Sequence, residues 1–334
     1  MNQRGAATLV EVLVAIFIMA IGMITLLTLF PLGLLSMAQA IKDDRTGHAA
    51  ANATAIGNMW NIRWADNKPA GTAGPYWSLS GGWFNTPPAA TYPLLPALTS
   101  GPGYPIYVDT IGIFNSSPNT VGALTPTGWP AVSAPGFPRT DVNSTSLMAT
   151  TGPGAWRSLW FTLMDDMEFE NNGIPAGGNP ASGGNTIERE GRYSWAYLLR
   201  MNDVTKPTVG VTLTVVVYSG RPRLFSEQTY QARWGPSPTG NVVRLYWNPA
   251  NPRPAIRRGG WILEPTLIAT GNPPNTNGYF YRVVNVTDVT SDIAGMLAMD
   301  LELQSIRHGV TSGSDPGASA IVIMEGVVEV FERG

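Results

Sequence analysis

Cysteine is absent from this chain of 334 residues, and charged side chains are scarce. Without cysteine there is no disulfide framework, no reactive thiolate and no cysteine-ligated metal. Charged residues make up 13% of the sequence, and the formal net charge is −2. A protein that binds nucleic acid through its phosphates needs a strongly basic surface. We therefore expect no nucleic-acid partner, and a fold stabilised by a hydrophobic core, which a chain of this length can build.

Histidine is almost as scarce, since the chain has only His48 and His308. Neither has a second histidine or an acidic motif at the spacing of known metal motifs. No serine lies in a nucleophile elbow with a visible general base. We interpret His48 as a residue on a helix face and His308 as a solvated residue in a turn. The sequence thus predicts a protein that is not an enzyme and has no cofactor.

The most informative feature that is present is an apolar run from Leu9 to Met37 that contains one ionised side chain, Glu11. About 20 apolar residues span a bilayer core, so this run is long enough to cross a membrane. A carboxylate costs about 2.5–3.5 kcal/mol at mid-membrane on insertion scales. We therefore expect Glu11 to have a partner or a function.

The residues before the run resemble a known processing signal: Arg4-Gly5-Ala6-Ala7-Thr8-Leu9-Val10-Glu11. They are similar to the class III signal of the type IV pilin and type II secretion pseudopilin family. The resemblance implies that a prepilin peptidase removes a leader of residues 1–6, that Ala7 becomes a methylated N-terminus, and that Glu11 is the fifth mature residue. The family usually has glycine before the cut, and a cut after Gly5 would make Glu11 the sixth residue.

Two other classes of N-terminal segment compete with this interpretation. An ordinary secretory signal would end at a small-x-small site such as Ala38-Gln39-Ala40. Its apolar region normally has 7–15 residues, which is much shorter than this run. A simple membrane anchor explains the length of the run, but it explains neither Glu11 nor the small residues before it.

The family resemblance implies an α+β, pilin-like fold in which one long N-terminal helix packs on an antiparallel β-sheet. After the leader, residues 7–37 are expected to form a transmembrane or filament-core helix, and residues 38–66 its amphipathic continuation. Residues 67–191 are rich in glycine and proline and are expected to be an enlarged variable region. Residues 192–334 are expected to form the antiparallel sheet.

Local patterns refine this division of the chain. We predict one helix from Ala7 to Trp64, with a kink or locally melted turn near Phe30-Pro31 because proline removes a backbone hydrogen bond. We also predict a strand at Tyr104–Phe114. The last third carries seven further predicted strands: Arg192–Arg200, Val209–Tyr218, Val242–Trp247, Trp261–Leu263, Tyr279–Val286, Met296–Gln304 and Ala320–Phe331. In the first of these, Tyr193, Trp195, Tyr197 and Leu199 alternate with smaller or polar residues and predict one aromatic face.

The chain has one acidic cluster, at the end of a short helix predicted for Ala155–Glu170. Its carboxylates are the only metal candidates that the sequence offers: Asp165, Asp166, Glu168 and Glu170. Oxygen ligands suit calcium, and some pseudopilins bind calcium in the globular domain. However, the spacing matches no known calcium loop, so we favour a solvated helix face.

Together these features predict a minor pilin or pseudopilin, which is a structural subunit of a type IV pilus or a type II secretion filament. Its expected partners are other pilin or pseudopilin subunits, the prepilin peptidase, the inner-membrane assembly platform and the lipid bilayer. We expect a single-pass inner-membrane protein with an extracytoplasmic C-terminal domain. The alternative is a membrane-tethered binding module, for example for carbohydrate, because the 11 tryptophans offer stacking surfaces. An anchored hydrolase is the weakest alternative.

Overall fold

The computed structural model describes the following residues: 9–59, 62, 105–110, 120–121, 136–141, 161–163, 166, 168–171, 186–189, 191–201, 211–221, 227–235, 240–265, 267–268, 275–276, 278–287, 290–291, 295–308 and 318–333. The chain divides into two compact units, Met1–Gly47 and His48–Gly334. Together the described residues define an α+β protein with one long N-terminal helix and antiparallel β-sheets.

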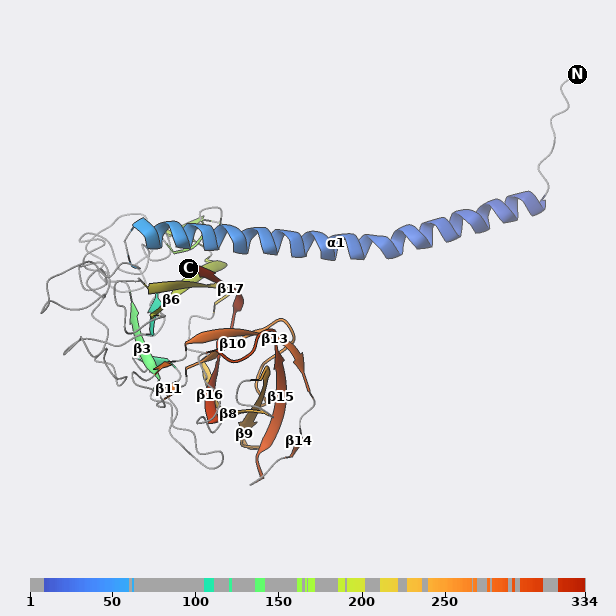
Figure 1. Cartoon of the computed structure of the whole chain (residues 1–334). Coiled ribbons are helices and arrows are strands. Elements are labelled where there is room, and N and C mark those ends of the chain that lie inside the picture. The colour runs from blue at the N-terminus through green and yellow to red at the C-terminus, as the bar shows by residue number, and fades with distance from the viewer. Residues whose placement is uncertain are drawn as a thin grey trace, which may run out of the picture. The chain divides into compact units, whose positions relative to one another are not determined.

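Helix α1 runs from Leu9 to Met59 (Figure 1). It ends five residues before the predicted end at Trp64, in a turn where the Ile62 N–H donates to the carbonyl of Gly57 at 3.2 Å. Of the two alternatives predicted near Phe30-Pro31, the locally melted turn is wrong, because the helix continues through Pro31, and the kink stays a prediction. One proline removes a single hydrogen bond, and the helix-forming leucines and alanines on either side keep the remaining turns intact.

Within the described residues, α1 is the one helix that is long and apolar enough to cross a membrane, and its most apolar segment is fully exposed. A membrane anchor and a signal sequence both have this character. The prediction of a long apolar N-terminal helix is therefore confirmed.

The second unit contains a six-stranded sheet, called the first sheet below, with the order β17-β7-β6-β1-β3-β2. Its strands in chain order are β1 (Ile106–Asp109), β2 (Thr120–Val121), β3 (Phe137–Asp141), β6 (Tyr193–Met201), β7 (Val211–Ser219) and β17 (Val327–Arg333). All neighbouring strands are antiparallel except β1 and β3, which are parallel. Within residues 192–334 the described strand pairs of this sheet, β6–β7 and β7–β17, are antiparallel as predicted, and the parallel pair lies in the region that was predicted to be variable.

One face of the first sheet packs against the last turns of α1. Ala49, Ala50 and Ala53 are fully buried there, against side chains that include Trp195 and Tyr197. The Tyr197 hydroxyl donates to the carbonyl of Ala53 at 2.8 Å, and the Trp195 indole N–H donates to that hydroxyl at 3.1 Å. The small alanines let helix and sheet approach closely. The predicted aromatic face of the strand at residues 192–200 is thus confirmed as core.

The remaining long strands close into a six-stranded antiparallel barrel, which was not predicted. They are β8 (Gln228–Trp234), β9 (Val242–Trp247), β10 (Trp261–Glu264), β13 (Tyr279–Val286), β15 (Leu297–Leu303) and β16 (Ala318–Ile323). The order β13-β10-β16-β8-β9-β15 is closed by the pairing of β15 with β13. The expectation of one sheet over residues 192–334 is therefore wrong, since these strands belong to two sheets. The inward-facing side chains of the barrel strands form a separate hydrophobic core.

The predicted strand at Ala320–Phe331 is in fact two strands in different sheets. β16 ends at Ile323 and β17 begins at Val327, with a turn at Glu325-Gly326. Gly326 has φ +83°, a conformation that side chains with a Cβ rarely adopt. At this turn the chain leaves the barrel and joins the first sheet beside β7.

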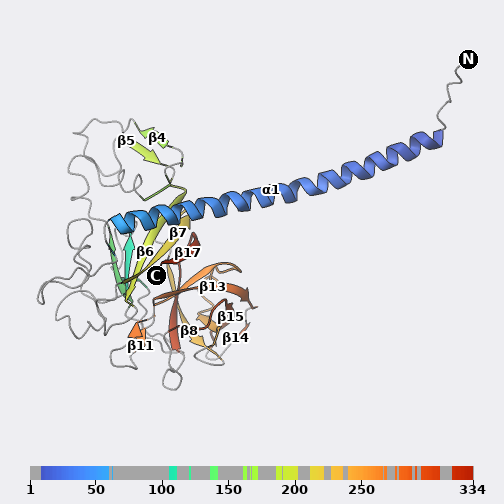
Figure 2. The ribbon, with the colours of Figure 1, turned by 45° about the horizontal axis from the view of Figure 1, so that its top comes forward.

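The barrel packs on the face of the first sheet opposite the last turns of α1. Buried side chains of the sheet, such as Leu198 and Val216, meet Leu263 and Val322 of the barrel in a separate core cluster. In Figures 1 and 2 the orange barrel strands lie on this side. Four short strands complete the described structure as β4–β5 and β11–β12 pairs, and β14 (Thr290–Ser291) extends the barrel beside β15. Their bounds are β4 (Glu168–Asn171), β5 (Thr186–Arg189), β11 (Leu267–Ile268) and β12 (Asn275–Thr276).

Candidate functional site

The predicted processing residues Gly5, Ala6 and Ala7 lie outside the described residues. Glu11 lies in the first turn of α1, and its side chain is exposed. The large apolar side chains on both sides of Glu11 are also exposed over the whole run, from Leu9 at 76% to Met37 at 61%. An exposed apolar surface of this length marks a membrane or protein contact rather than a surface facing water.

Glu11 shares one face of α1 with a row of small residues. At 3.6 residues per turn, the following positions lie within about 40° of one line along the helix: Glu11, Ala15, Ile18, Gly22, Thr25, Leu29, Gly33, Ser36 and Ala40. Seven of the nine are small or polar, and nothing lies within 4 Å of a Cβ placed on Gly22 or Gly33. Helices packed side by side in a membrane favour such small residues, because they let the backbones approach closely.

The hydroxyl groups on this face are satisfied within the helix itself. Thr25 donates to the carbonyl of Ile21 at 2.8 Å, and Ser36 donates to that of Leu32 at 2.9 Å. These bonds lower the cost of placing the hydroxyls in an apolar surrounding. The face as a whole therefore exposes one carboxylate among small and apolar side chains.

The acidic cluster does not form the predicted helix. Phe161–Leu163 contains an isolated bridge from Thr162 to Ser194, and Glu168 and Glu170 lie on strand β4, paired with β5. Asp166 is buried, with 5% of its surface exposed, so the interpretation as a solvated helix face is wrong. The backbone of residues 168–171 forms a strand because it pairs with β5. The local sequence alone does not show this pairing.

The fourth carboxylate of the cluster, Asp165, lies outside the described residues. Among the residues that are described, no group of three or more histidine, cysteine, aspartate or glutamate side chains is arranged to hold a metal ion. The structure thus adds no support for calcium within its described part.

The two histidines have different surroundings. His48 is exposed on α1, as predicted. His308 is also largely exposed, but its ring stacks on Tyr279 at 4.7 Å between centroids, and its backbone N–H donates to the Tyr281 hydroxyl at 3.0 Å. His308 is therefore part of an organised site rather than simply solvated.

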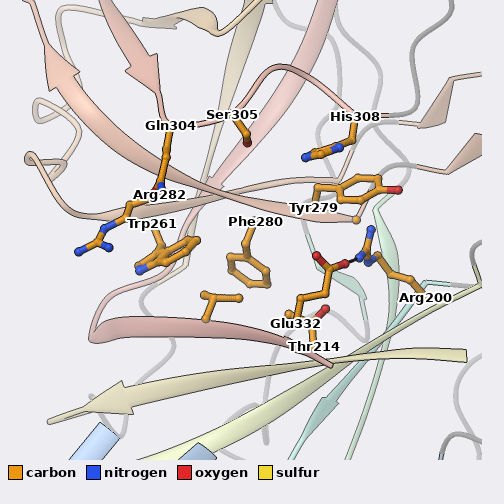
Figure 3. A pocket seen from close by; sticks show the side chains of 12 residues that line it. Arg200, Thr214, Trp261, Tyr279, Phe280, Arg282, Gln304, Ser305, His308 and Glu332 are labelled. Atoms are coloured by element: carbon orange, nitrogen blue, oxygen red, sulfur yellow. Dashed lines mark ion pairs between the residues drawn. The ribbon is translucent and has the colours of Figure 1, made fainter. Parts of the chain in front are cut away.

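This site is a cavity of about 320 Å³ between the first sheet and the barrel, called the sheet–barrel cavity below. Figure 3 shows its lining side chains. The sheet contributes residues from β6, β7 and β17, and the barrel contributes residues from β10, β13 and the segment after β15. The lining residues are Arg200, Thr214, Trp261, Gly278, Tyr279, Phe280, Arg282, Gln304, Ser305, His308, Val330 and Glu332.

At one end of the cavity, Tyr279 lies between two polar planar groups. The Arg200 guanidinium lies 3.8 Å from the ring centroid, and the His308 ring stacks at 4.7 Å. Figure 3 shows the two groups on opposite sides of the Tyr279 ring. Arg200 also forms an ion pair with Glu332. Arg200 is thus fixed by a cation–π contact and by a carboxylate.

Close packing keeps this end of the cavity in place. A Cβ on Gly278 would lie 2.9 Å from Cγ of Pro105 and 3.4 Å from Cδ of Arg200. A glycine at this position therefore allows the backbone just before β13 to approach Pro105, next to β1, and Arg200 of β6 closely.

The other end of the cavity is formed by a cross-strand pair on the outside of the barrel. Trp261 of β10 and Arg282 of β13 are directly opposite each other, and the guanidinium lies 5.9 Å from the indole ring. Trp261 is half-buried and Arg282 is exposed. The Gln304 N–H donates to the carbonyl of Arg282 at 2.9 Å, which brings the segment after β15 to the same place.

Burial and the positive charge of Arg200 both affect the pKa of His308. Burial lowers the pKa of His308, and the nearby positive charge of Arg200 lowers the pKa further. Burial likewise lowers the pKa of Arg200, although the Tyr279 hydroxyl opposes this change. Both shifts follow from the cost of placing positive charge in a partly enclosed site.

We expect a pH dependence of stability from this arrangement. The folded state favours the neutral imidazole, so the contribution of His308 is complete above the usual histidine pKa of about 6.5. It is lost as the pH falls through the lower pKa of the folded state. Thermal unfolding from pH 7.5 to pH 5 should show a smaller loss of Tm for His308→Asn than for the unchanged protein. His48→Asn is the control, and an equal loss in both variants would contradict the expectation.

The cavity offers groups for binding rather than for nucleophilic chemistry. Ser305 and His308 both line it, but no hydrogen bond joins them in the described structure. Glu332 pairs with Arg200 and not with the imidazole. The serine, base and orienting acid of a hydrolase are therefore not assembled among these residues.

Sequence reasoning placed Trp261 and Tyr279 on predicted strands but did not bring them together. The missing information was the pairing of β10 with β13, which puts Trp261 opposite Arg282. No protein-family model, curated protein or solved structure matches this chain.

Proposed function

We propose that this protein is a pilin-like structural subunit, a minor pilin or pseudopilin, of a type IV pilus or a type II secretion filament. The observation that carries the proposal is one continuous helix of 51 residues with two different surroundings. Its first part exposes apolar side chains along its length, while Ala49, Ala50 and Ala53 are fully buried in the core of the second unit. Such a helix suits a subunit that moves from a bilayer into a helical bundle.

The face that carries Glu11 supports this proposal. The small residues at Ala15, Gly22 and Gly33 allow close helix packing, and Glu11 is placed to neutralise the N-terminal amine of a neighbouring subunit. A pair of opposite charges is much stronger in a low-dielectric surrounding than in water. A carboxylate buried there without a partner is strongly penalised. The pairing would therefore fix the axial register of neighbouring subunits.

On this proposal the protein is made as a single-pass inner-membrane precursor with its second unit outside the cytoplasm. The prepilin peptidase removes residues 1–6, and the assembly platform transfers the subunit from the lipid bilayer to other pilin or pseudopilin subunits. Its action is assembly and not catalysis.

The test is mass spectrometry of the N-terminal peptide of the native protein. We expect a mature chain that begins at Ala7, or at Ala6 if the cut follows Gly5, with a methylated amine. A chain beginning at Ile41 would indicate ordinary secretion, and an intact Met1 would indicate an unprocessed anchor. Either result would contradict the proposal.

A second candidate function is a membrane-tethered binding module that uses the signal only for localisation. The observation that favours it is the sheet–barrel cavity, which combines Trp261, Arg282 and Gln304 in one depression. The two functions are distinguished by fractionation. A subunit is recovered in sheared filaments, whereas a tethered module stays in the membrane.

A further inference from the structure

The sheet–barrel cavity has the composition of a small-ligand site. Its apolar part includes Trp261, Phe280 and Val330, while Gln304 and Ser305 supply groups that both donate and accept hydrogen bonds. Small-molecule sites typically combine an apolar wall with a few placed polar groups. The volume of about 320 Å³ is at the lower end of the usual range of about 300–1,000 Å³, so the ligand is small.

The charged side chains that line the cavity indicate which charge a ligand should carry. Arg200 is committed to Glu332 and is only 6% exposed. Arg282 is exposed at the other end of the cavity, and it forms no ion pair within the described part of the chain. One uncommitted guanidinium matches one negative charge, and a carboxylate is its usual bidentate partner. A phosphate group carries up to two charges and would need further cations.

Two N–H groups of the lining residues are also available. Nε of Arg200 and Nε1 of Trp261 are buried and have no hydrogen-bond partner among the described residues. Buried donors are nearly always satisfied in folded proteins. A ligand that carries several oxygen atoms would supply acceptors at this site.

We propose that the sheet–barrel cavity binds one uronic acid residue of an acidic polysaccharide. The apolar face of the sugar ring packs on Trp261, and its carboxylate pairs with Arg282. The sugar hydroxyls meet Gln304 and Ser305, whose side chains can both donate to them and accept from them. This inference goes beyond the proposed function, since a filament subunit and a tethered module could both use such a site.

The experiment is calorimetric titration of the full-length protein in detergent micelles with galacturonate and with galactose. The two sugars differ only in the carboxylate, so galacturonate should bind at least about tenfold more tightly, as expected for one charge-assisted hydrogen-bonded pair. Arg282→Gln should remove most of this difference. Trp261→Leu should weaken the binding of both sugars.

Arg253→Gln is the matched control, because Arg253 is exposed on the barrel and does not line the cavity. Its affinity for galacturonate should be unchanged, and the circular dichroism spectrum of Arg282→Gln should match that of the unchanged protein. Equal affinity for the two sugars would overturn the proposal, as would the absence of galacturonate binding at about 10 mM, where even weak sites are occupied. Tighter binding of a tetrapeptide with a free C-terminal carboxylate would assign the cavity to peptides instead.

Discussion

On the proposed function, replacing Glu11 by alanine is expected to leave the subunit in the membrane and to remove it from filaments. In the bilayer the change removes a carboxylate, so insertion should be unaffected or improved by at most about 3 kcal/mol. In the filament the amine of the neighbouring subunit would lose its partner and remain as an uncompensated buried charge. The measurement is the amount of protein in membranes and in sheared filaments, in cells that also make the unchanged subunit.

Further variants of α1 distinguish the pairing of Glu11 with a neighbouring amine from a role of Glu11 in stability. Glu11→Asp keeps the charge but shortens the reach, so its incorporation should be intermediate. Gly22→Leu fills the face that carries Glu11 and should also impair incorporation. Ala20→Leu is its matched control, because Ala20 lies on the opposite side of the helix and is exposed. Normal incorporation of Glu11→Ala would eliminate the pairing mechanism, and loss of the protein from the membrane would indicate a role in stability.

The helix and the aromatic strand β6 could be predicted because their signals are local. The length and apolar character of residues 9–37 predict a helix by themselves, and the alternation of Tyr193, Trp195 and Tyr197 predicts one buried face. The aromatic face of β6 must be buried against another element, and the alanines of α1 pack on it. Strand β8 was not predicted, although Ala232 and Trp234 alternate in the same way, because its first half is polar.

The barrel could not be predicted because its closure depends on pairings between distant strands. β13 contacts both β10 and β15, and the second contact turns a sheet into a ring. Nothing in the local sequence of Tyr279–Val286 distinguishes a strand in a barrel from one in an open sheet. The same limit applies to Ala320–Phe331, where only the glycine at position 326 marks the change from one sheet to the other.

The sheet–barrel cavity could not be predicted from the sequence for the same reason. Arg200, Trp261 and Glu332 come from three strands that are far apart in the sequence, and each has an ordinary explanation by itself. A charged residue near the end of a predicted strand is normally solvated. Arg200 is instead buried, because the barrel covers the face of the first sheet from which it projects.

The barrel core contains a second pair of charges that the sequence does not reveal. Glu264 and Arg307 are both fully buried, with Nη2 of Arg307 2.7 Å from Oε1 of Glu264. The indole N–H of Trp234 donates to the same oxygen at 3.2 Å, and the Tyr281 hydroxyl donates to Oε2 at 3.3 Å. Burial raises the pKa of Glu264, and the guanidinium of Arg307 opposes this change. The pair is therefore costly to bury and costlier to break.

We expect Glu264→Gln to destabilise the second unit by about 3–5 kcal/mol, because the neutral amide removes the buried carboxylate charge that pairs with the Arg307 guanidinium. Adding Arg307→Met should recover a large part of this loss of stability. Methionine removes the buried positive charge and fills much of the arginine volume, and the amide oxygen from Glu264→Gln can still accept a hydrogen bond from the Trp234 indole N–H. Urea unfolding at pH 8, followed by tryptophan fluorescence, measures both variants. Glu302→Gln is the control, because Glu302 is exposed on β15 and should change stability by no more than about 0.5 kcal/mol. If Glu264→Gln cost no more than this control, the buried pair would not stabilise the barrel. If the double variant were less stable than Glu264→Gln alone, the loss of the carboxylate charge beside Arg307 would not be the cause.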